Sequence, residues 1–250
     1  MYDAALVTDL RPQGPAPRPA VSAVLPAYDE VAVIADVASR TVAALDAAGV
    51  PEFEVIVVDD GSTDGTGPAV AALAEQEPRV RLVSHERNRG YGAALRTGFH
   101  AARHDAVWLM DADGQFDPAD VTRLLDAWAP GTMVAGYRAQ RQDPLLRRAS
   151  NRAFFTVVRA TMGATTRDVN CAFKLFPRDI VDGLHCDGAM VSTELMLAAR
   201  ERGLRVAEVA IPHYPRTAGT ATGNDPAVVA RAFGELWRMW LSRRAPRSRR

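Results

Sequence analysis

Short runs of consecutive apolar residues alternate, along the first half of the chain, with longer segments in which apolar residues recur every three or four positions. The short runs have the length and composition of buried strands, and the longer segments have the period of amphipathic helices. The predicted strands cover residues 21–26, 54–60, 80–84, 107–110 and 132–136, and the predicted helices cover residues 31–48, 66–76, 92–103 and 118–127. Such alternation predicts a parallel, right-handed, doubly wound α/β sheet.

The alternation breaks down after Arg138, where a charged stretch begins. Beyond this point the pattern predicts helices over residues 150–162 and 192–202 and strands over residues 172–176 and 205–211. We expect three parts in all: a disordered leader rich in proline (residues 1–20), one α/β domain (residues 21–223), and a basic amphipathic helix with a tail (residues 224–250).

Composition narrows the function classes. Basic and acidic residues balance at 30 each, so charge gives no support to nucleic-acid binding. Cys171 and Cys186 lack the spacing of a metal site or a disulfide framework, and we interpret the five histidines as structural because none shows zinc-ligand spacing. No secretory signal opens the sequence, and no apolar run reaches the roughly 20 residues that span a bilayer. These features favour a cytoplasmic protein.

The most informative segment is the apolar run over residues 106–110, which ends in Asp111 and Asp113. Parallel strands present the residues at their carboxyl ends to the edge where ligands bind. Side chains two residues apart on an extended backbone point the same way, so these two carboxylates can share one cation. Oxygen ligands favour Mg²⁺ or Mn²⁺, with positions left for phosphate oxygens. The alternative is an acidic pair that only caps the following helix.

Acidic residues also follow the first two predicted strands, as Asp29-Glu30 and Asp59-Asp60. At one sheet edge, these acids and the later pair would repel one another unless a cation or hydrogen-bond donors compensated them. This favours a site for a sugar nucleotide and a divalent metal. The glycine-containing residues 88–94 either allow close approach of a substrate or simply begin a helix, since neither a dinucleotide fingerprint nor a Walker A sequence is present.

Four segments, taken in order, carry a family resemblance: Pro26-Ala27-Tyr28-Asp29-Glu30, residues 57–66, residues 88–94, and Asp111-Ala112-Asp113-Gly114-Gln115. Over residues 21–223 the chain resembles the family 2 glycosyltransferases of the GT-A fold, and within them the dolichyl-phosphate (polyprenyl-phosphate) mannosyltransferases. The resemblance implies a Rossmann-like, doubly wound, mixed sheet, mostly parallel, with helices on both faces. Asp29 replaces the usual Asn and Tyr91 a common Lys, which leaves the donor and the acceptor headgroup open.

The resemblance also implies roles for single residues. The nucleotide would be held by Pro26, Tyr28, Glu30, Asp60, Gly92, Asp111 and Ala112. The cofactor, Mg²⁺ or Mn²⁺, would be coordinated by Asp111, Asp113 and Gln115. The phosphate of a polyprenyl acceptor would be bound by Arg138, Arg147, Arg148, Ser150 and Arg216.

The residues themselves support an anionic acceptor. Arginines dominate residues 138–152, and guanidinium groups suit phosphate oxygens, although a solvated basic loop is the alternative. A phosphate monoester is already anionic near neutral pH, whereas a hydroxyl acceptor needs a general base. Asp168 and Glu194 are the candidates for that base. Both also have structural interpretations, Asp168 in a loop salt bridge and Glu194 as a helix cap.

Residues 224–250 predict an amphipathic helix followed by a basic tail. Asp225 and Pro226 are a favourable N-cap and first residue. The arginines that follow suit an anionic lipid surface, where each contributes about 1 kcal/mol. This segment predicts a helix at the membrane surface or one packed on the domain, and the two can coexist.

The leading hypothesis is an inverting, metal-dependent glycosyltransferase that moves a hexose from GDP-mannose or UDP-glucose to a polyprenyl phosphate, with Asp113, Arg138 and Arg216 as catalytic residues. It would work peripherally at the cytoplasmic face of a membrane or with a membrane protein partner. One alternative keeps the fold but uses a saccharide or small-molecule hydroxyl acceptor. Another is a non-enzymatic module that binds a sugar nucleotide.

Overall fold

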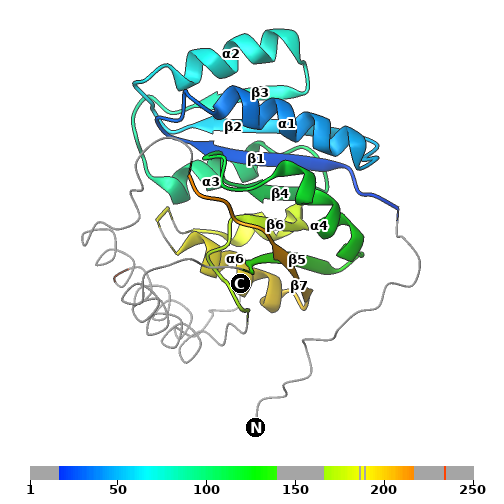
Figure 1. The fold of residues 1–250 in the computed structure, drawn as a ribbon. Coiled ribbons are helices and arrows are strands. Elements are labelled where there is room, and N and C mark those ends of the chain that lie inside the picture. Colours follow the sequence, from blue (N-terminus) through cyan, green and yellow to red (C-terminus); the bar gives the residue numbers. More distant parts are fainter. Residues whose placement is uncertain (1–16, 140–165, 186, 189, 217–233, 235–250) are drawn as a thin grey trace.

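A single mixed sheet forms the centre of the computed structural model, which describes residues 17–139, 166–185, 187–188, 190–216 and 234. Its seven strands lie in the order β3-β2-β1-β4-β6-β5-β7 (Figure 1). The strands are β1 (Val21–Ala27), β2 (Phe53–Asp59), β3 (Val80–Ser84), β4 (Ala106–Met110), β5 (Thr132–Arg138), β6 (Phe173–Pro177) and β7 (Arg205–Ile211).

Helices cover both faces of this sheet, as expected for a doubly wound fold. They are α1 (Ile34–Ala47), α2 (Thr66–Gln76), α3 (Tyr91–Ala101), α4 (Val121–Ala127) and α6 (Val191–Glu201), with 3₁₀ turns η1 (Pro118–Asp120) and η2 (Arg178–Gly183). On one side α1 packs against α2 and η1, and on the other α3 packs against η2, which also contacts α6. The predicted doubly wound α/β fold with a mixed, mostly parallel sheet is confirmed.

β6 is the strand that makes the sheet mixed. It lies between β4 and β5 and is antiparallel to both, with Lys174 opposite Leu109 on one side and Ala135 on the other. Every other pair in the sheet is parallel. The carboxyl ends of β1, β2 and β4, which are adjacent strands, therefore meet at one edge.

The apolar runs form the predicted core. Every residue of β1, β2 and β4 is buried, as expected for central strands that helices cover on both faces. Trp108 in β4 is fully buried, and its ring meets that of Phe173 in β6 edge to face, with 5.4 Å between centroids. The strands that present the acidic residues are therefore anchored in the hydrophobic core.

Two predicted helices differ from the observed ones. The helix expected from residue 31 begins at Ile34, because the chain first turns over the carbonyl of Glu30, which accepts from the amides of Val33 and Ile34. The helix expected over residues 118–127 is divided into η1 and α4. The predicted helix over residues 150–162, all of the predicted helix and tail over residues 224–250 except residue 234, and most of the predicted leader lie outside the described residues.

Candidate active site

The loop after β1 is joined to the loop after β2 by side-chain to backbone hydrogen bonds. Asp29 has φ +53°, a left-handed conformation that Asp and Asn tolerate better than most residues. Its carboxylate accepts from the amide of Thr63 at 2.9 Å, and its own amide donates to Ser62 Oγ at 2.9 Å. The replacement of the usual Asn by Asp at this position is therefore compatible with the turn. The turn places Glu30 beside the sheet edge.

Arg216 brings the ends of β1 and β4 together. Its Nη2 donates to Asp113 Oδ2 at 2.7 Å and its Nη1 to Glu30 Oε1 at 3.3 Å. The other oxygen of Glu30, Oε2, is buried and has no hydrogen-bond partner among the residues that the structure describes. Burial raises the pKa of Glu30, Arg216 opposes this, and Asp113 adds to it. A buried carboxylate oxygen of this kind can accept from a hydroxyl or N–H group of a ligand.

Asp111 lies beside Asp113 and carries negative charge that the protein compensates only in part. It accepts a hydrogen bond from Tyr91 Oη at 2.9 Å. Burial, followed by the neighbouring charge of Asp113, raises the pKa of Asp111 to about 7. A divalent cation would relieve this cost, so the two carboxylates fit the predicted metal.

Gln115, the third predicted metal ligand, is tied to its neighbours in the described structure. Its amide donates to Asp113 Oδ1 at 3.0 Å, and its side-chain Nε2 donates to the carbonyl of Tyr214 at 3.0 Å. Across the described ranges, no group of three or more His, Cys, Asp or Glu side chains could hold a metal ion. Asp111 and Asp113 remain the predicted charged ligands of the metal.

Asp60, at the end of β2, is surrounded by donors from the loop after β3. Its Oδ1 contacts His85 Nδ1 at 2.6 Å and accepts from the amide of Arg89 at 2.9 Å, while its Oδ2 accepts from the amide of Gly90 at 2.8 Å. The close approach of the two loops depends on Gly61, where φ is +75° and a Cβ atom would clash with the backbone of Arg87.

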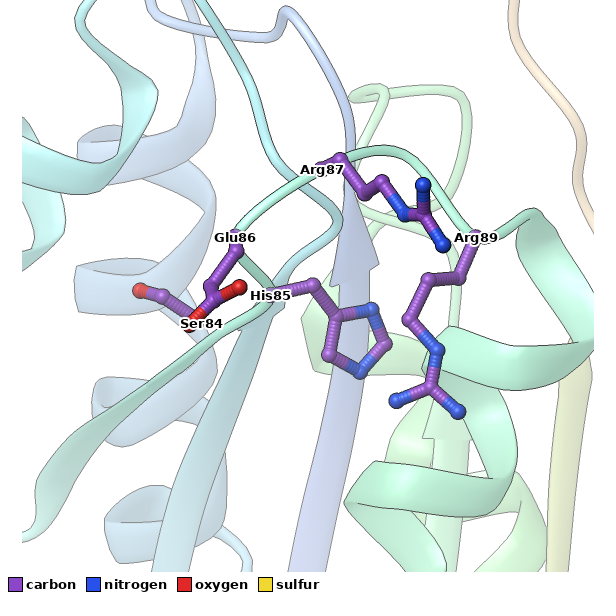
Figure 2. Close-up of a pocket in the computed structure, with 5 residues that line it drawn as sticks. All are labelled: Ser84, His85, Glu86, Arg87 and Arg89. Carbon is purple, nitrogen blue, oxygen red and sulfur yellow. The ribbon is translucent and has the colours of Figure 1, made fainter.

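A hollow of about 260 Å³ lies at the loop after β3, and two of the residues that line it, His85 and Arg89, contact Asp60. It is lined by Ser84, His85, Glu86, Arg87 and Arg89, whose side chains are shown in Figure 2. Its positive lining suits an anionic or aromatic ligand group. The sequence interpretation of His85 as merely structural missed this placement, since its partners are distant in the chain.

The other predicted nucleotide residues fall into two groups. Tyr28 is exposed, with 40% of its surface accessible, whereas Pro26 and Ala112 are buried. Gly92, the second residue of α3, packs closely against the chain's own backbone, where a Cβ atom would clash with Asp187 and Gly188. Its lack of a side chain therefore serves packing within the protein.

The predicted acceptor residue Arg138 and the predicted base Asp168 bind each other. Arg138 Nε lies 2.7 Å from Asp168 Oδ2 and its Nη2 lies 2.9 Å from Oδ1, a bidentate geometry. The salt-bridge interpretation of Asp168 matches this arrangement. Glu194, the second candidate base, is buried and accepts from the amide of His185 with both oxygens, at 3.0 and 2.9 Å. Arg147, Arg148 and Ser150 lie outside the described residues.

Lys174 is a charged residue near this site that the sequence interpretation did not single out. It is fully buried in β6, and its Nζ donates to the carbonyl of Val169 at 3.0 Å and to that of Cys171. Burial lowers the pKa of Lys174. The signal in the sequence was a lysine at the centre of the apolar run Ala172-Phe173-Lys174-Leu175-Phe176.

Comparison of the sequence with known proteins identifies a family. The sequence model described as "Glycosyl transferase family 2" matches residues 22–184. An undecaprenyl-phosphate 4-deoxy-4-formamido-L-arabinose transferase of Edwardsiella ictaluri is 32% identical over 203 residues, which are 80% of this chain and 61% of that protein. A protein of the same name from Pseudomonas aeruginosa is 37% identical over 190 residues, or 75% of this chain and 52% of that protein.

The chain thus spans less than two thirds of the length of these relatives. Among solved structures, glucosyl-3-phosphoglycerate synthase of Mycobacterium tuberculosis, crystallised with Mn²⁺ and UDP-glucose, superimposes with a TM-score of 0.69. That match is 24% identical and covers 88% of this chain and 78% of the other, and it supports the fold alone. Both the family model and the identity to the transferases lead to one conclusion: the chain belongs to glycosyl transferase family 2.

Proposed function

We propose that this chain is the catalytic domain of an inverting glycosyltransferase that transfers a sugar from a nucleoside diphosphate to a polyprenyl phosphate, with undecaprenyl phosphate as the lipid to test first. The observation that carries the proposal is the contact of Arg216 with both Glu30 and Asp113. It gathers two carboxylates and a guanidinium at the edge where the sheet of such proteins binds ligands. The names of the relatives supply the lipid phosphate.

The donor would lie across the carboxyl ends of β1, β2 and β4. In this proposal Asp60 and the hollow beside it receive the nucleoside, and Glu30 Oε2 accepts from one of its polar hydrogens. Asp111 and Asp113 would hold Mg²⁺ or Mn²⁺, which when bound neutralises the leaving diphosphate. The hydroxyl of Tyr91 keeps one oxygen of Asp111 oriented for that task.

The acceptor would need little acid–base help from the protein, because a phosphate monoester is already a nucleophile near neutral pH. Arg216 supplies the guanidinium at this edge that such an anion would bind, in exchange for one of its two carboxylate partners, Glu30 or Asp113. A hydroxyl acceptor is disfavoured because both candidate bases are engaged, Asp168 by Arg138 and Glu194 by the amide of His185. The roles of Arg147, Arg148 and Ser150 in acceptor binding remain part of the proposal.

The site of action would be the cytoplasmic face of a membrane, where the lipid phosphate is found, with the predicted helix over residues 224–250 as a peripheral contact or as the contact with a membrane protein partner. Within the ranges that the structure describes, no helix combines the length and the apolar character needed to cross a bilayer. The identity of the sugar also belongs to the proposal. GDP-mannose and UDP-glucose are the first donors to test, and nucleotide-linked 4-deoxy-4-formamido-L-arabinose is added because the relatives are named for it.

The proposal is tested by incubating the full chain with Mn²⁺ or Mg²⁺, undecaprenyl phosphate in detergent, and each labelled donor in turn. We expect label to enter the organic phase with one donor, and Asp113→Asn to abolish this transfer. Arg123→Ala is the matched control, because Arg123 is an exposed arginine paired with Asp120 away from the site. Absence of lipid-linked label with every donor, or equal transfer by Asp113→Asn, would contradict the proposal.

A further inference from the structure

A chain of three side chains from three elements ends on Asp60. Thr97 Oγ1 lies 2.9 Å from His85 Nε2, and His85 Nδ1 lies 2.6 Å from Asp60 Oδ1. Asp60 follows β2, His85 follows β3, and Thr97 lies within α3. The side chains of His85 and Asp60 are almost completely buried, with 5% and 4% exposed.

The polarity of this chain is fixed by Asp60. Its carboxylate can only accept, so His85 Nδ1 carries the proton of the bond between them. With a neutral ring, Nε2 accepts from the Thr97 hydroxyl; with a charged ring, Nε2 donates to the same oxygen. In both states Thr97 fixes the ring and the ring fixes Asp60 Oδ1.

His85 also holds the loop that completes the surroundings of Asp60. Its amide donates to the carbonyl of Asp59 at 2.9 Å, which joins the start of this loop to the end of β2. The amides of Arg89 and Gly90 then reach the two oxygens of Asp60. Asp60 Oδ1 thereby has two donors and Oδ2 has one, so Oδ2 retains capacity to accept from a ligand.

We propose that His85 is a positioning residue for the donor nucleotide. Through its bond to Asp60 it orients the carboxylate and, with it, the loop whose Arg87 and Arg89 line the adjacent hollow (Figure 2). Thr97 supports this role by holding the far side of the ring. The inference rests on the proposed function, because it takes the bound ligand to be a nucleoside diphosphate.

The two ring nitrogens of His85 have different roles, since Nδ1 contacts Asp60 and Nε2 contacts Thr97. The side-chain nitrogen of Asn occupies the place of histidine Nδ1, so His85→Asn keeps a donor for Asp60 and gives up only the contact with Thr97. His85→Ala loses both contacts. A histidine that only stabilised the fold would lower the melting temperature in both variants without separating them in nucleotide affinity.

The experiment measures the affinity of the full-length chain for UDP and GDP in the presence of Mn²⁺ by calorimetry. We expect His85→Ala to weaken the binding of the preferred nucleotide by about tenfold, the size of one lost hydrogen bond to a charged group. We expect His85→Asn to stay within about threefold of the wild type, and Thr97→Val to lie between the wild type and His85→Asn, because Thr97→Val keeps the whole ring and its bond to Asp60. In the transfer assay the loss should lie in KM for the donor, with kcat nearly unchanged. His100→Ala is the matched control, since His100 is an exposed histidine of α3 bonded only to the carbonyl of Arg96 among the described contacts.

Binding by the wild type tests the proposed function, and binding by the variants tests the role of His85. Failure of the wild type to bind either nucleotide would overturn the proposed function itself. Normal binding by the wild type, loss in Asp60→Asn, and unchanged affinity in His85→Ala would overturn the role of His85 alone. Equal losses in His85→Asn and His85→Ala, or a fall in kcat without a change in nucleotide affinity, would do the same. If His85→Ala fails to fold, His85→Asn and Thr97→Val still test the order of affinities.

Discussion

Arg216 Nη2 lies 2.7 Å from Asp113 Oδ2, and this ion pair joins the segment after β7 to the loop after β4. The same segment is fixed by Tyr214, whose amide donates to the carbonyl of Gln115 at 2.9 Å and whose carbonyl accepts from the Gln115 side chain. The guanidinium thus neutralises a carboxylate that is also a candidate metal ligand. A cation that binds Asp113 competes with Arg216 for the same oxygen.

This competition predicts that Arg216→Ala binds free Mn²⁺ more tightly than the wild type when no nucleotide is present. A partly buried ion pair contributes about 1 kcal/mol, so the expected gain is about fivefold. The transfer rate should fall at the same time, because an acceptor phosphate loses its guanidinium partner. Electron paramagnetic resonance of free Mn²⁺ measures the affinity directly. Unchanged or weaker Mn²⁺ binding would show that the pair does not compete with the metal.

The raised pKa of Asp111 predicts how stability depends on pH. Because burial and Asp113 raise the pKa of this carboxyl from 3.8 to about 7, the folded protein holds the proton more tightly than the unfolded chain does. Without metal, this group therefore lowers the free energy of unfolding as the pH rises from about 4 to about 7. Asp111→Asn should remove this loss of free energy of unfolding. Its melting temperature should therefore match that of the wild type at pH 4 and exceed it by a few degrees at pH 8. In a chain of this size, each kcal/mol corresponds to about 2–4 °C.

Thermal denaturation in a metal-free buffer series checks this expectation. Asp36→Asn is a suitable control, because Asp36 is an exposed acid on α1 in an i,i+4 pair with Arg40. A difference between Asp111→Asn and the wild type that did not vary with pH would mean that Asp111 is ionised normally in the folded protein.

Asp168→Asn distinguishes a structural carboxylate from a general base. Removing one partner of a buried, bidentate ion pair costs about 3 kcal/mol, so the melting temperature should fall by several degrees. The dependence of kcat on pH should keep its shape in the folded variant, because a phosphate acceptor needs no base. Disappearance of an acidic limb from the profile would instead support a hydroxyl acceptor that Asp168 deprotonates.

Lys174→Met tests whether a buried cation supports the site. Replacing Lys174 by an apolar side chain of similar length leaves two buried carbonyls without their donor, so the free energy of unfolding should fall by about 1–3 kcal/mol, a loss that leaves the variant folded. Transfer should nevertheless slow by about tenfold, because the carbonyls of Val169 and Cys171 lose the donor that fixes the loop carrying Asp168. Denaturant unfolding and the transfer assay are to be compared on one preparation. Wild-type activity in a stable variant would show that Lys174 serves folding alone.

The sequence allowed prediction of the parts of the fold that depend on local pattern. The apolar runs of β1, β2 and β4 are buried at every position, and such strands can be predicted from their own sequence, without knowledge of the neighbouring strands. The place of β6 between β4 and β5 was not predictable in this way. Its run contains a lysine, and local periodicity does not specify which strand lies beside it or in which direction.

The candidate active site shows the same difference between residues that a local pattern identifies and residues that depend on distant partners. Asp111 and Asp113 were found because they end a strand, and a strand end has a known place in a parallel sheet. The contact of Arg216 with Asp113 links residues 103 positions apart, and only the family resemblance pointed to it. His85 was passed over because its partners come from two other elements and no spacing of histidines marks it.

We propose that Asp111 and Asp113 bind a nucleoside diphosphate through a divalent cation. Calorimetric titration of UDP and GDP, with and without Mn²⁺, is the direct test of this role. We expect Mn²⁺ to strengthen binding of the preferred nucleotide to the wild type by at least about tenfold, and we expect Asp111→Asn and Asp113→Asn to lose this enhancement. Equal affinity with and without Mn²⁺, or an enhancement that survives in both variants, would contradict it.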